Sequence, residues 1–417
     1  MKYLLVTDGT WGDTLPFIFL AKELIKNNQE VLLLTNEYYE EYIKKENIPF
    51  QKTTTIEDRN KFLSNKDLWD PYKGMGVIGQ YSGVIFEKSI NILEKINPKE
   101  ITMVIAHAFV YSAKTHCEMH NIPYSCLLIS PIQIKSTYRL PIFYGGKNFN
   151  FIPQKIKSFV YPFIDKFILD PKFDKKINQY RIKNNLKPIK SFVFWSTISN
   201  ITLALWPEWY SKKELDYPDF IKFCNFPKKV ELFLDKHTDD EITTWIKSGQ
   251  KPILVTLGSG YLHGQQMLQN LEKLSSIYKK RIIFIGPKEN NTDFTNKYII
   301  SVKHLSLSKI LPLCSIAIHH GGAGTTAQVI KSGIPHIVIP QSHDQPDNAW
   351  HIRNNHFGEI IWNQCPDEKI LNEFIEKIEK SKKIQTTCLK AKTIVENQKD
   401  GIENATQYIL DLPPQTL

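Results

Sequence analysis

The sequence predicts an α/β protein with two doubly wound domains, and three observations support this prediction. The chain has 417 residues, more than the ~250–300 residues at which a single hydrophobic core stops growing. Apolar runs of strand length alternate with amphipathic stretches of helix length, which is typical of parallel strands covered by helices on both faces. Each half also has a glycine-containing loop between a strand and a helix, where open α/β sheets bind ligands. We expect domains at residues 1–225 and 251–417, joined by a linker at 226–250.

Strand candidates occur in both halves of the chain. In the first half they are Tyr3–Thr7, Val31–Thr35, Met103–Ala106, Ser125–Ile129 and Ile201–Leu205. The alternation starts again in the second half, with Ile253–Leu257, Ile282–Ile285, Ser315–Ile318, His336–Ile339 and Glu359–Trp362. The intervening segment Cys224–Gln250 contains Pro227, adjacent lysines and an acidic run, so we interpret its greater part as a linker.

Residues Pro131–Tyr180 do not fit this alternation. Phenylalanines and tyrosines stand there among lysines and prolines, with little periodicity. One interpretation is an insertion that packs on its own aromatic side chains. The other is a wall of an acceptor pocket or a surface that contacts a membrane, because aromatic and basic residues together suit an amphiphile. Both interpretations stay open at this point.

The composition favours a folded protein with anionic partners. Hydrophobic residues make up 42% and charged residues 23%, and 53 Lys and Arg against 43 Asp and Glu give a net charge of +10. No window combines clustered basic residues with stacking aromatics, so we expect no nucleic-acid binding and assign most of the excess charge to solvated surface.

The cysteines and the amino terminus bear on compartment and metal content. The six cysteines form no C-x-x-C pair and no His-spaced zinc motif, so we expect reduced, mostly buried thiols. The opening MKYLLVTDG lacks the features of a signal peptide, and no apolar run reaches the length of a membrane span. We therefore expect a cytoplasmic protein, with peripheral membrane contact left open and the oligomeric state unassigned.

The strongest motif begins at the strand candidate Ser315–Ile318. This strand leads into His319-His320-Gly321-Gly322-Ala323-Gly324-Thr325-Thr326, and helix character follows over Ala327–Lys331. Glycines let a ligand approach the backbone, and a helix amino terminus offers unpaired N–H groups to an anion. His320 and Thr325 add donors. The motif predicts a diphosphate site, whereas a glycine turn without the histidines would predict only tight packing.

A polar loop follows the next strand candidate, His336–Ile339. It contains Asp344 and Gln345 within Q-S-H-D-Q-P-D-N-A, and both loops should emerge at the carboxyl edge of one sheet. A carboxylate beside a carboxamide can hydrogen-bond neighbouring sugar hydroxyls. A simple Asp-Gln-Pro turn is the alternative for either residue alone.

Together, H-H-G-G-A-G-T-T and D-Q-P-x-N-A resemble the donor-binding signature of the family 1 glycosyltransferases, especially the bacterial and sterol-glycosylating branch. The resemblance implies a GT-B fold, in which two Rossmann-like domains face each other across a cleft. It also implies a UDP- or dTDP-linked sugar as co-substrate, with no cofactor. In this scheme the diphosphate is held by His320, Gly322 and the backbone of Gly324–Thr326, including Thr326. The sugar is held by Asp344 and Gln345.

Three further segments extend or depart from the resemblance. Pro252–Gly260 resembles the family's first strand of the second domain with its phosphate-contacting loop, which nominates Ser259. Leu203–Pro227 is similar to a stretch of the rhamnosyltransferases of rhamnolipid synthesis, which keeps dTDP-rhamnose beside UDP-glucose as a donor. Where the family usually has an aromatic residue before a proline, this chain has His304, which we assign to stacking on the nucleobase.

The segment Thr7–Pro16 supplies the candidate general base. It resembles the G-x-x-G-D-x-x-P motif of sterol and glycopeptide-antibiotic glycosyltransferases, with Gly9 and Gly12 bracketing the loop before a helix expected near Phe17. Asp13 would remove the acceptor's proton, a contribution of roughly 10²–10⁴ in rate. A helix N-cap is the structural alternative for Asp13, and the two roles are compatible.

His107, which follows the strand Met103–Ala106, is the second catalytic candidate. It could line the acceptor cleft or relay a proton, although a histidine at a strand end is more often structural. The expected reaction is a single in-line displacement that inverts the anomeric carbon of a hexosyl donor. The acceptor would be a small, lipophilic or natural-product molecule with a hydroxyl group. No D-x-D triplet occurs, so we expect no bound metal.

Three other functions were weighed. An NAD-dependent oxidoreductase would carry G-x-G-x-x-G after the first strand, where this chain has Gly9-x-x-Gly12. A catalytically inactive auxiliary protein of the same fold should have lost Asp13 or His320, and both are present. A nucleotide-sugar epimerase is disfavoured by the Asp344–Gln345 pair.

Overall fold

The computed structural model describes the chain except for residues 1, 229–235, 259–262, 287–291, 297 and 413–417. It consists of two compact units. The first comprises Met1–Pro141, Asn148–Val230 and Lys399–Leu417, and the second comprises Ile142–Lys147 and Glu231–Gln398. Each half of the chain therefore contributes a segment to the other unit.

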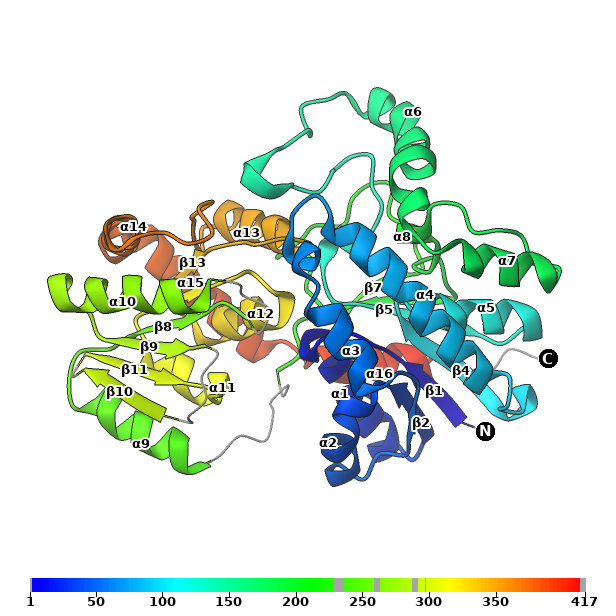
Figure 1. Ribbon diagram of the computed structural model, residues 1–417, viewed down its shortest axis with the longest axis horizontal. Helices are drawn as coiled ribbons and strands as arrows, with labels where there is room; N and C mark the ends of the chain where they lie inside the picture. Colours follow the sequence, from blue (N-terminus) through cyan, green and yellow to red (C-terminus); the bar gives the residue numbers. More distant parts are fainter. Residues whose placement is uncertain (1, 229–235, 259–262, 287–291, 297, 413–417) are drawn as a thin grey trace. The chain divides into compact units, whose positions relative to one another are not determined.

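The first unit contains a parallel sheet of seven strands (Figure 1). The strands are β1 (Lys2–Val6), β2 (Glu30–Thr35), β3 (Phe50–Lys52), β4 (Ile101–His107), β5 (Tyr124–Leu128), β6 (Ile201–Ala204) and β7 (Ile221–Phe223). Their order is β3-β2-β1-β4-β5-β6-β7, so the direction of winding reverses between β1 and β4. In a doubly wound sheet, ligands bind beyond the carboxyl ends of the strands at such a reversal.

Helices cover both faces of this sheet. The helices of the first unit are α1 (Trp11–Lys26), α2 (Glu40–Lys45), α3 (Ile56–Leu63), α4 (Gly74–Leu93), α5 (Tyr111–His120), α6 (Gln154–Ile164), α7 (Lys175–Lys183), α8 (Phe192–Trp195) and α16 (Gly401–Leu410). α1 and α16 pack together over alternate side chains of β1, including Tyr3 and Leu5, in one hydrophobic core. α4 and α5 pack together outside that core, and α5 contacts β4 (Figure 1).

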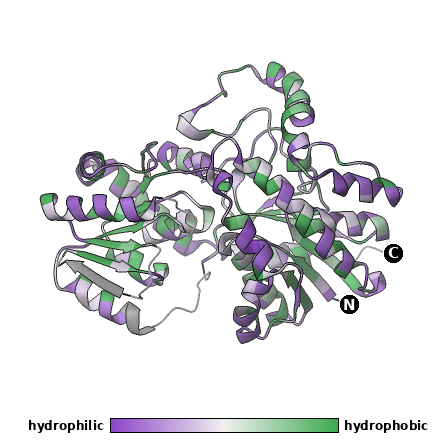
Figure 2. Ribbon diagram, in the orientation of Figure 1, coloured by the Kyte–Doolittle hydropathy of each residue, from purple (hydrophilic) through white to green (hydrophobic). Residues whose placement is uncertain are grey.

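The second unit repeats the arrangement. Its sheet has the order β10-β11-β9-β8-β12-β13-β14, and the β10–β11 pair is antiparallel while the other pairs are parallel. The strands are β8 (Ile253–Thr256), β9 (Ile282–Ile285), β10 (Thr292–Asn296), β11 (Ile299–Val302), β12 (Ile316–His319), β13 (His336–Val338) and β14 (Gly358–Ile360). The helices are α9 (Lys236–Lys247), α10 (Gly264–Tyr278), α11 (Leu307–Ile310), α12 (Ala323–Ser332), α13 (Gln345–Asn354), α14 (Glu368–Lys380) and α15 (Lys382–Asn397). Figure 2 shows the strands of both sheets as mostly hydrophobic, as expected for strands buried on both faces.

The unit boundaries differ from those expected from sequence at three places. Residues 142–147 belong to the second unit, and the other two differences involve helices. Residues 399–412 pack with the first unit, because Ile402, Ala405 and Ile409 of α16 enter the core beneath α1. The segment expected as a linker contains α9, whose Ile242 and Ile246 are buried in the core of the second unit. In both cases the apolar side chains fill a core, and the sequence pattern does not say which one.

The aromatic segment 131–180 divides into buried and exposed parts. Phe173 joins a buried cluster with Phe86 and Phe192, as expected for an insertion that packs on aromatics. Phe151, Phe159 and other apolar side chains remain exposed.

The remaining expectations on cysteines and membrane spans can be checked directly. Five cysteines are buried and Cys365 is partly exposed, and all six are free thiols as expected. Among the described residues, no helix combines the length and apolarity needed to cross a bilayer.

Candidate functional site

The loop after β1 holds Asp13 at the start of α1. The helix begins at Trp11, six residues before the expected start, because Thr10 is its N-cap. Asp13 Oδ2 accepts hydrogen bonds from the Thr10 backbone N–H (2.7 Å) and the Thr10 hydroxyl (2.8 Å). Asp13 is therefore the third residue of the helix rather than its N-cap, and this reciprocal arrangement fixes its carboxylate.

The two glycines of this loop differ in what they contribute. Gly9 has φ +124°, and a Cβ added there would lie 2.6 Å from Asp13 Oδ2, so a side chain would displace the carboxylate. A Cβ on Gly12 would meet only the Thr10 hydroxyl at an ordinary 3.5 Å. The space for Asp13 thus depends on Gly9.

His107 lies beside the second oxygen of the same carboxylate. Its Nε2 is 3.6 Å from Asp13 Oδ1, and the side chain is almost completely buried. Burial lowers the pKa of His107, against the opposing effect of Asp13, so the ring is neutral at neutral pH. The Phe109 N–H faces Nδ1 at 3.4 Å, which places the ring proton on Nε2, toward Asp13. The structure therefore brings the two catalytic candidates together at the carboxyl ends of β1 and β4.

A buried carboxylate beneath this loop was missed in the sequence. Asp8 Oδ1 accepts hydrogen bonds from the Gly9 N–H (2.7 Å) and the Tyr81 hydroxyl (3.0 Å), and Oδ2 accepts one from Thr54. Burial raises the pKa of Asp8 to about 6, although these donors oppose the shift. Its position directly after β1, before Gly9, is the signal that could have identified it. Asp8 holds the loop that carries Asp13.

In the second unit, His320 sits in a narrow space between two glycines. A Cβ on Gly258 would approach its Cε1 to 3.2 Å, and a Cβ on Gly322 would approach its Nε2 to 2.4 Å. Burial lowers the pKa of His320 to about 4, so the free protein presents a neutral imidazole with one N–H. Nδ1 has no hydrogen-bond partner among the described residues. The ring also hydrogen-bonds the Thr256 backbone, so the ring is held in place and Nδ1 is its unused polar atom.

Gly322 is also the N-cap of α12, and it brings no side chain to cap the helix. The Thr326 N–H bonds back to the Gly322 carbonyl at 2.9 Å. The N–H groups of Ala323, Gly324 and Thr325 precede it and have no acceptor within the helix. Gly324 is exposed, Thr325 is partly exposed, and Thr326 is buried. This is the geometry of an anion site at a helix amino terminus.

The loop after β13 places Asp344 and Gln345 differently from one another. The Asn348 amide donates to Asp344 Oδ2 (2.8 Å) and to the Gly321 carbonyl (2.9 Å), which ties this loop to the one that carries His320. Gln345 is buried, and its Oε1 accepts from the backbone N–H groups of Gln341 (2.8 Å) and Ser342 (3.4 Å). The Gln345 oxygen therefore closes its own loop.

Two residues predicted to contact the nucleotide-sugar donor, Ser259 and His304, are not placed with the loops of His320 and Asp344. Ser259 lies outside the described residues. His304 follows β11 and is exposed. It belongs to the loop between β11 and α11, and not to the loops that carry His320 and Asp344.

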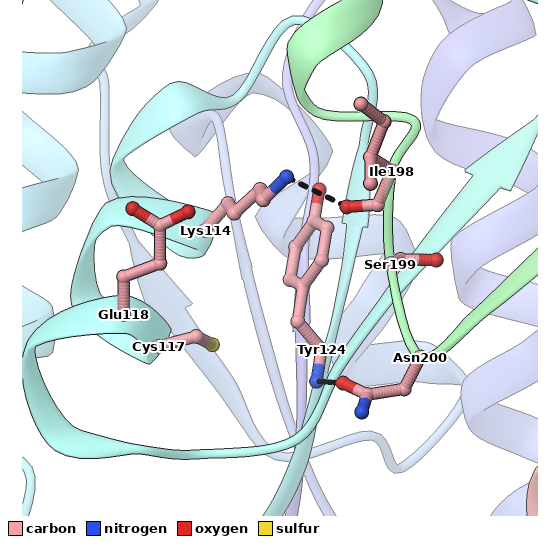
Figure 3. A pocket seen from close by; sticks show the side chains of 7 residues that line it. All are labelled: Lys114, Cys117, Glu118, Tyr124, Ile198, Ser199 and Asn200. Carbon is pink, nitrogen blue, oxygen red and sulfur yellow. Dashed lines mark hydrogen bonds between the residues drawn. The ribbon is translucent and has the colours of Figure 1, made fainter. Parts of the chain in front are cut away.

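A pocket of about 320 Å³ in the first unit lies away from these loops (Figure 3). Tyr124 begins β5 and Asn200 immediately precedes β6, so the pocket opens at the amino edge of the sheet, opposite Asp13. Lys114 Nζ donates to the carbonyls of Trp195 (2.7 Å) and Ile198 (2.6 Å), and burial lowers its pKa to about 8. These contacts give Lys114 a structural role.

The described residues contain one group that could hold a metal ion: Glu94, His116 and His120, whose ligand atoms lie within 4.8 Å of one another. His116 Nδ1 is 2.9 Å from Glu94 Oε1, and His120 Nε2 is 3.7 Å from Glu94 Oε2. The sequence prediction considered zinc motifs that contain cysteines, whereas His116 and His120 are one helical turn apart on α5. The spacing of four residues between the two histidines was the sequence signal for this candidate metal site. The group shares no residue with the loops around Asp13 or His320.

Comparison with known families gives two matches, one in each unit. Residues 3–138 match the glycosyltransferase family 28 N-terminal domain. Residues 276–396 match the C-terminal domain of erythromycin biosynthesis protein CIII-like proteins. Both units therefore match glycosyltransferase family models, and the homologues and structural neighbours are GT-B glycosyltransferases of the UDP-glycosyltransferase family.

Individual GT-B relatives are distant. A sterol 3-beta-glucosyltransferase of Arabidopsis thaliana is 22% identical over 83% of this chain and 57% of its own length. An O-mycaminosyltylonolide 6-deoxyallosyltransferase of Streptomyces fradiae is 28% identical over 27% of this chain and 26% of its own length. The chain thus spans between about a quarter and just over a half of these two curated relatives.

Solved structures match the fold along almost the whole chain. The glycotransferase of kitacinnamycin superposes with a TM-score of 0.71 at 13% identity, over 98% of both chains. The glycosyltransferase VinC, in complex with dTDP, gives a TM-score of 0.68 at 13% identity, over 98% of this chain and 99% of its own. These similarities establish the GT-B fold that the sequence predicted.

Proposed function

We propose that the protein transfers a hexosyl group from a UDP- or dTDP-linked donor to a hydroxyl of a small, lipophilic or natural-product acceptor. The observation that carries the proposal is the loop before α12. It combines an uncapped helix terminus with a buried His320 that has an unused ring nitrogen. This arrangement suits a diphosphate. The neighbouring Asp344 loop, tied to it through Asn348, suits the sugar.

Asp13 acts as the general base in the proposed reaction. Its Oδ2 is occupied by Thr10, so Oδ1, on the His107 side, is the oxygen that accepts the acceptor's proton. The acceptor oxygen attacks the anomeric carbon from the face opposite the diphosphate. The carbon–oxygen bond to the phosphate breaks, and the configuration inverts.

The leaving diphosphate gains negative charge during this step. The N–H groups at the start of α12 stabilise that charge without reorganising, and His320 Nδ1 adds a hydrogen bond when it carries the proton. No D-x-D triplet occurs, so we assign charge stabilisation to these groups and propose that turnover persists in EDTA.

His107 has a positioning role in this proposal. As a neutral ring with its proton on Nε2, it orients Asp13 Oδ1. An auxiliary protein without activity is the second candidate. The presence of Asp13 and His320, each held in a defined loop, favours an enzyme instead.

A thermal-shift screen tests the donor site. UDP, dTDP and their glucose, rhamnose and related sugars should raise the melting temperature, because they bind only the folded protein. The matching nucleoside monophosphates should raise it less, since they lack the second phosphate. A shift with NAD and none with nucleoside diphosphates would overturn the proposal. The anomeric configuration of the product, read by NMR, tests inversion.

A further inference from the structure

α6 buries polar side chains and exposes apolar ones, which is the reverse of an ordinary surface helix. Its buried side chains are Lys157 and Tyr161, and the following π-helical turn Asp165–Leu169 continues this inner line with Asp165. These three residues are spaced four apart and therefore share one face. The apolar face is left on the outside, where a globular protein would place polar side chains.

The inner polar face is held by specific contacts. Lys157 Nζ donates to the Tyr138 carbonyl at 2.9 Å. Asp165 Oδ2 accepts from Lys135 (2.5 Å) and from the Ser191 hydroxyl (2.6 Å). Because the inner groups have these partners, the polar side fixes the orientation of the helix and leaves the apolar side facing outward.

The outer face is large and contiguous. Phe159, Phe163 and Phe167 are 72%, 53% and 62% exposed, and successive rings lie 5.6 Å and 6.3 Å apart. The same segment exposes further apolar side chains: Ile156, Val160, Ile164 and Ile168. Figure 2 colours much of α6 as hydrophobic. Single exposed apolar residues are common, whereas a contiguous patch indicates an interaction surface.

The charged residues beside this apolar face indicate which kind of partner it fits. Lys155 and Lys166 are exposed beside the phenylalanines, and Lys166 Nζ is 5.0 Å from the Phe167 ring. Asp165 is the only acidic residue between positions 148 and 169, and it is buried against Lys135. An apolar ladder flanked by lysines, with no exposed carboxylate, complements an anionic lipid surface.

We propose that residues 154–169 form a membrane-docking face, in which α6 lies in the plane of an anionic bilayer. The phenylalanine ladder enters the boundary between headgroups and acyl chains, and Lys155 and Lys166 contact lipid phosphates. This inference does not depend on the catalytic proposal, and its test does not require activity.

The test is co-flotation of the full-length protein with phosphatidylcholine vesicles, with and without phosphatidylglycerol. The wild type should float with the anionic vesicles. The triple variant Phe159→Gln/Phe163→Gln/Phe167→Gln should bind at least about tenfold more weakly, because three apolar side chains leave the membrane. Lys155→Gln/Lys166→Gln should lose roughly tenfold or more, only on anionic vesicles.

A matched control removes exposed apolar residues elsewhere. Leu215, Ile182 and Leu389 are 85%, 59% and 59% exposed, and their joint replacement by Gln should leave flotation unchanged. Circular dichroism should show that all variants are folded. Wild-type protein that fails to float, or a control that loses as much binding as the phenylalanine variant, overturns the proposal. Concentration-dependent dimerisation that the phenylalanine variant abolishes, without vesicle binding, would assign the face to a second copy instead.

Discussion

Replacing Asp13 by Asn separates its proposed chemical role from its structural one. Asn keeps an oxygen that can accept from the Thr10 N–H and hydroxyl, the two contacts of the carboxylate at 2.7 and 2.8 Å. It loses the negative charge near the start of α1, which costs ~0.3–1 kcal/mol of stability. It also loses the ability to take a proton. Turnover should fall ~10²–10⁴-fold, which corresponds to about 2.7–5.4 kcal/mol in the activation barrier.

Thr10→Ala is the matched control for Asp13→Asn. It removes the hydroxyl that contacts Oδ2 and should lower stability by ~0.5–2 kcal/mol, while the carboxylate and most of the activity remain. The assay has two readouts: urea unfolding for stability, and sugar transfer to an acceptor found by screening sterols and macrolide aglycones. The reasoning fails if Asp13→Asn transfers sugar within about tenfold of the wild type. In that case Asp13 is a helix-capping residue and His107 becomes the candidate base.

Four further outcomes are expected. His320→Ala should weaken UDP or dTDP binding ~10–100-fold by calorimetry, the contribution of a hydrogen bond to a charged group; equal affinities would remove His320 from the phosphate site. Asp344→Ala should abolish turnover of nucleotide sugars while nucleoside diphosphate affinity stays nearly unchanged, and equal loss of both would leave the loop a structural turn. Gly322→Ala, whose Cβ would lie 2.4 Å from His320 Nε2, should weaken nucleotide binding as His320→Ala does, and titration with UDP would detect this. Finally, burial lowers the pKa of His320 to about 4 and of His336 to about 3 from an ordinary 6.5. The unfolded chain therefore binds more protons below pH 6.5, so the stability of the second unit should fall as pH drops from 6.5 toward 4. The loss should reach up to about 1.4 kcal/mol per pH unit for each histidine. Hydrogen exchange of β12 and β13 should show this loss, and His336→Gln should make stability depend less steeply on pH.

The strands were predictable because buried parallel strands are continuous apolar runs. Ile282–Ile285 has the same bounds in the sequence prediction and in the structure, and the other nine candidates differ at their ends by at most two residues. Four strands were missed: β3, β7, β10 and β11. β3 and β7 have only three residues each and no clear apolar run. β11 is a buried four-residue strand, so length alone does not explain why it was missed.

The start of α1 was misplaced for a physical reason. Pro16 was taken as part of the first turn, because proline favours that place. The structure instead has Pro16 inside the helix, after Thr10 and Asp13 have already formed its first turn. A polar pair three residues apart, Thr10 and Asp13, was the better start signal.

The site residues were identifiable by type, whereas their contacts were not. The motifs led to Asp13, His107 and His320 as candidates, and the structure adds Asp8, whose position after β1 was visible in the sequence but whose burial was not. The Gln345 oxygen satisfies two backbone donors in its own loop. These hydrogen bonds form only once the loop has folded back on itself, and the order of residues along the chain does not reveal that fold.

The return of α16 to the first unit has a consequence for how the protein is made. The first unit needs Ile402, Ala405 and Ile409 to complete the core beneath α1, yet these residues leave the ribosome after all of Glu231–Gln398. The usual order, in which amino-terminal domains finish folding first, therefore cannot hold for this chain. The second unit can close during synthesis, while the first retains an exposed apolar groove along α1 until α16 has been synthesised. A chaperone that binds nascent chains should find its longest-lived target in this groove, because the segment that forms it is made long before α16.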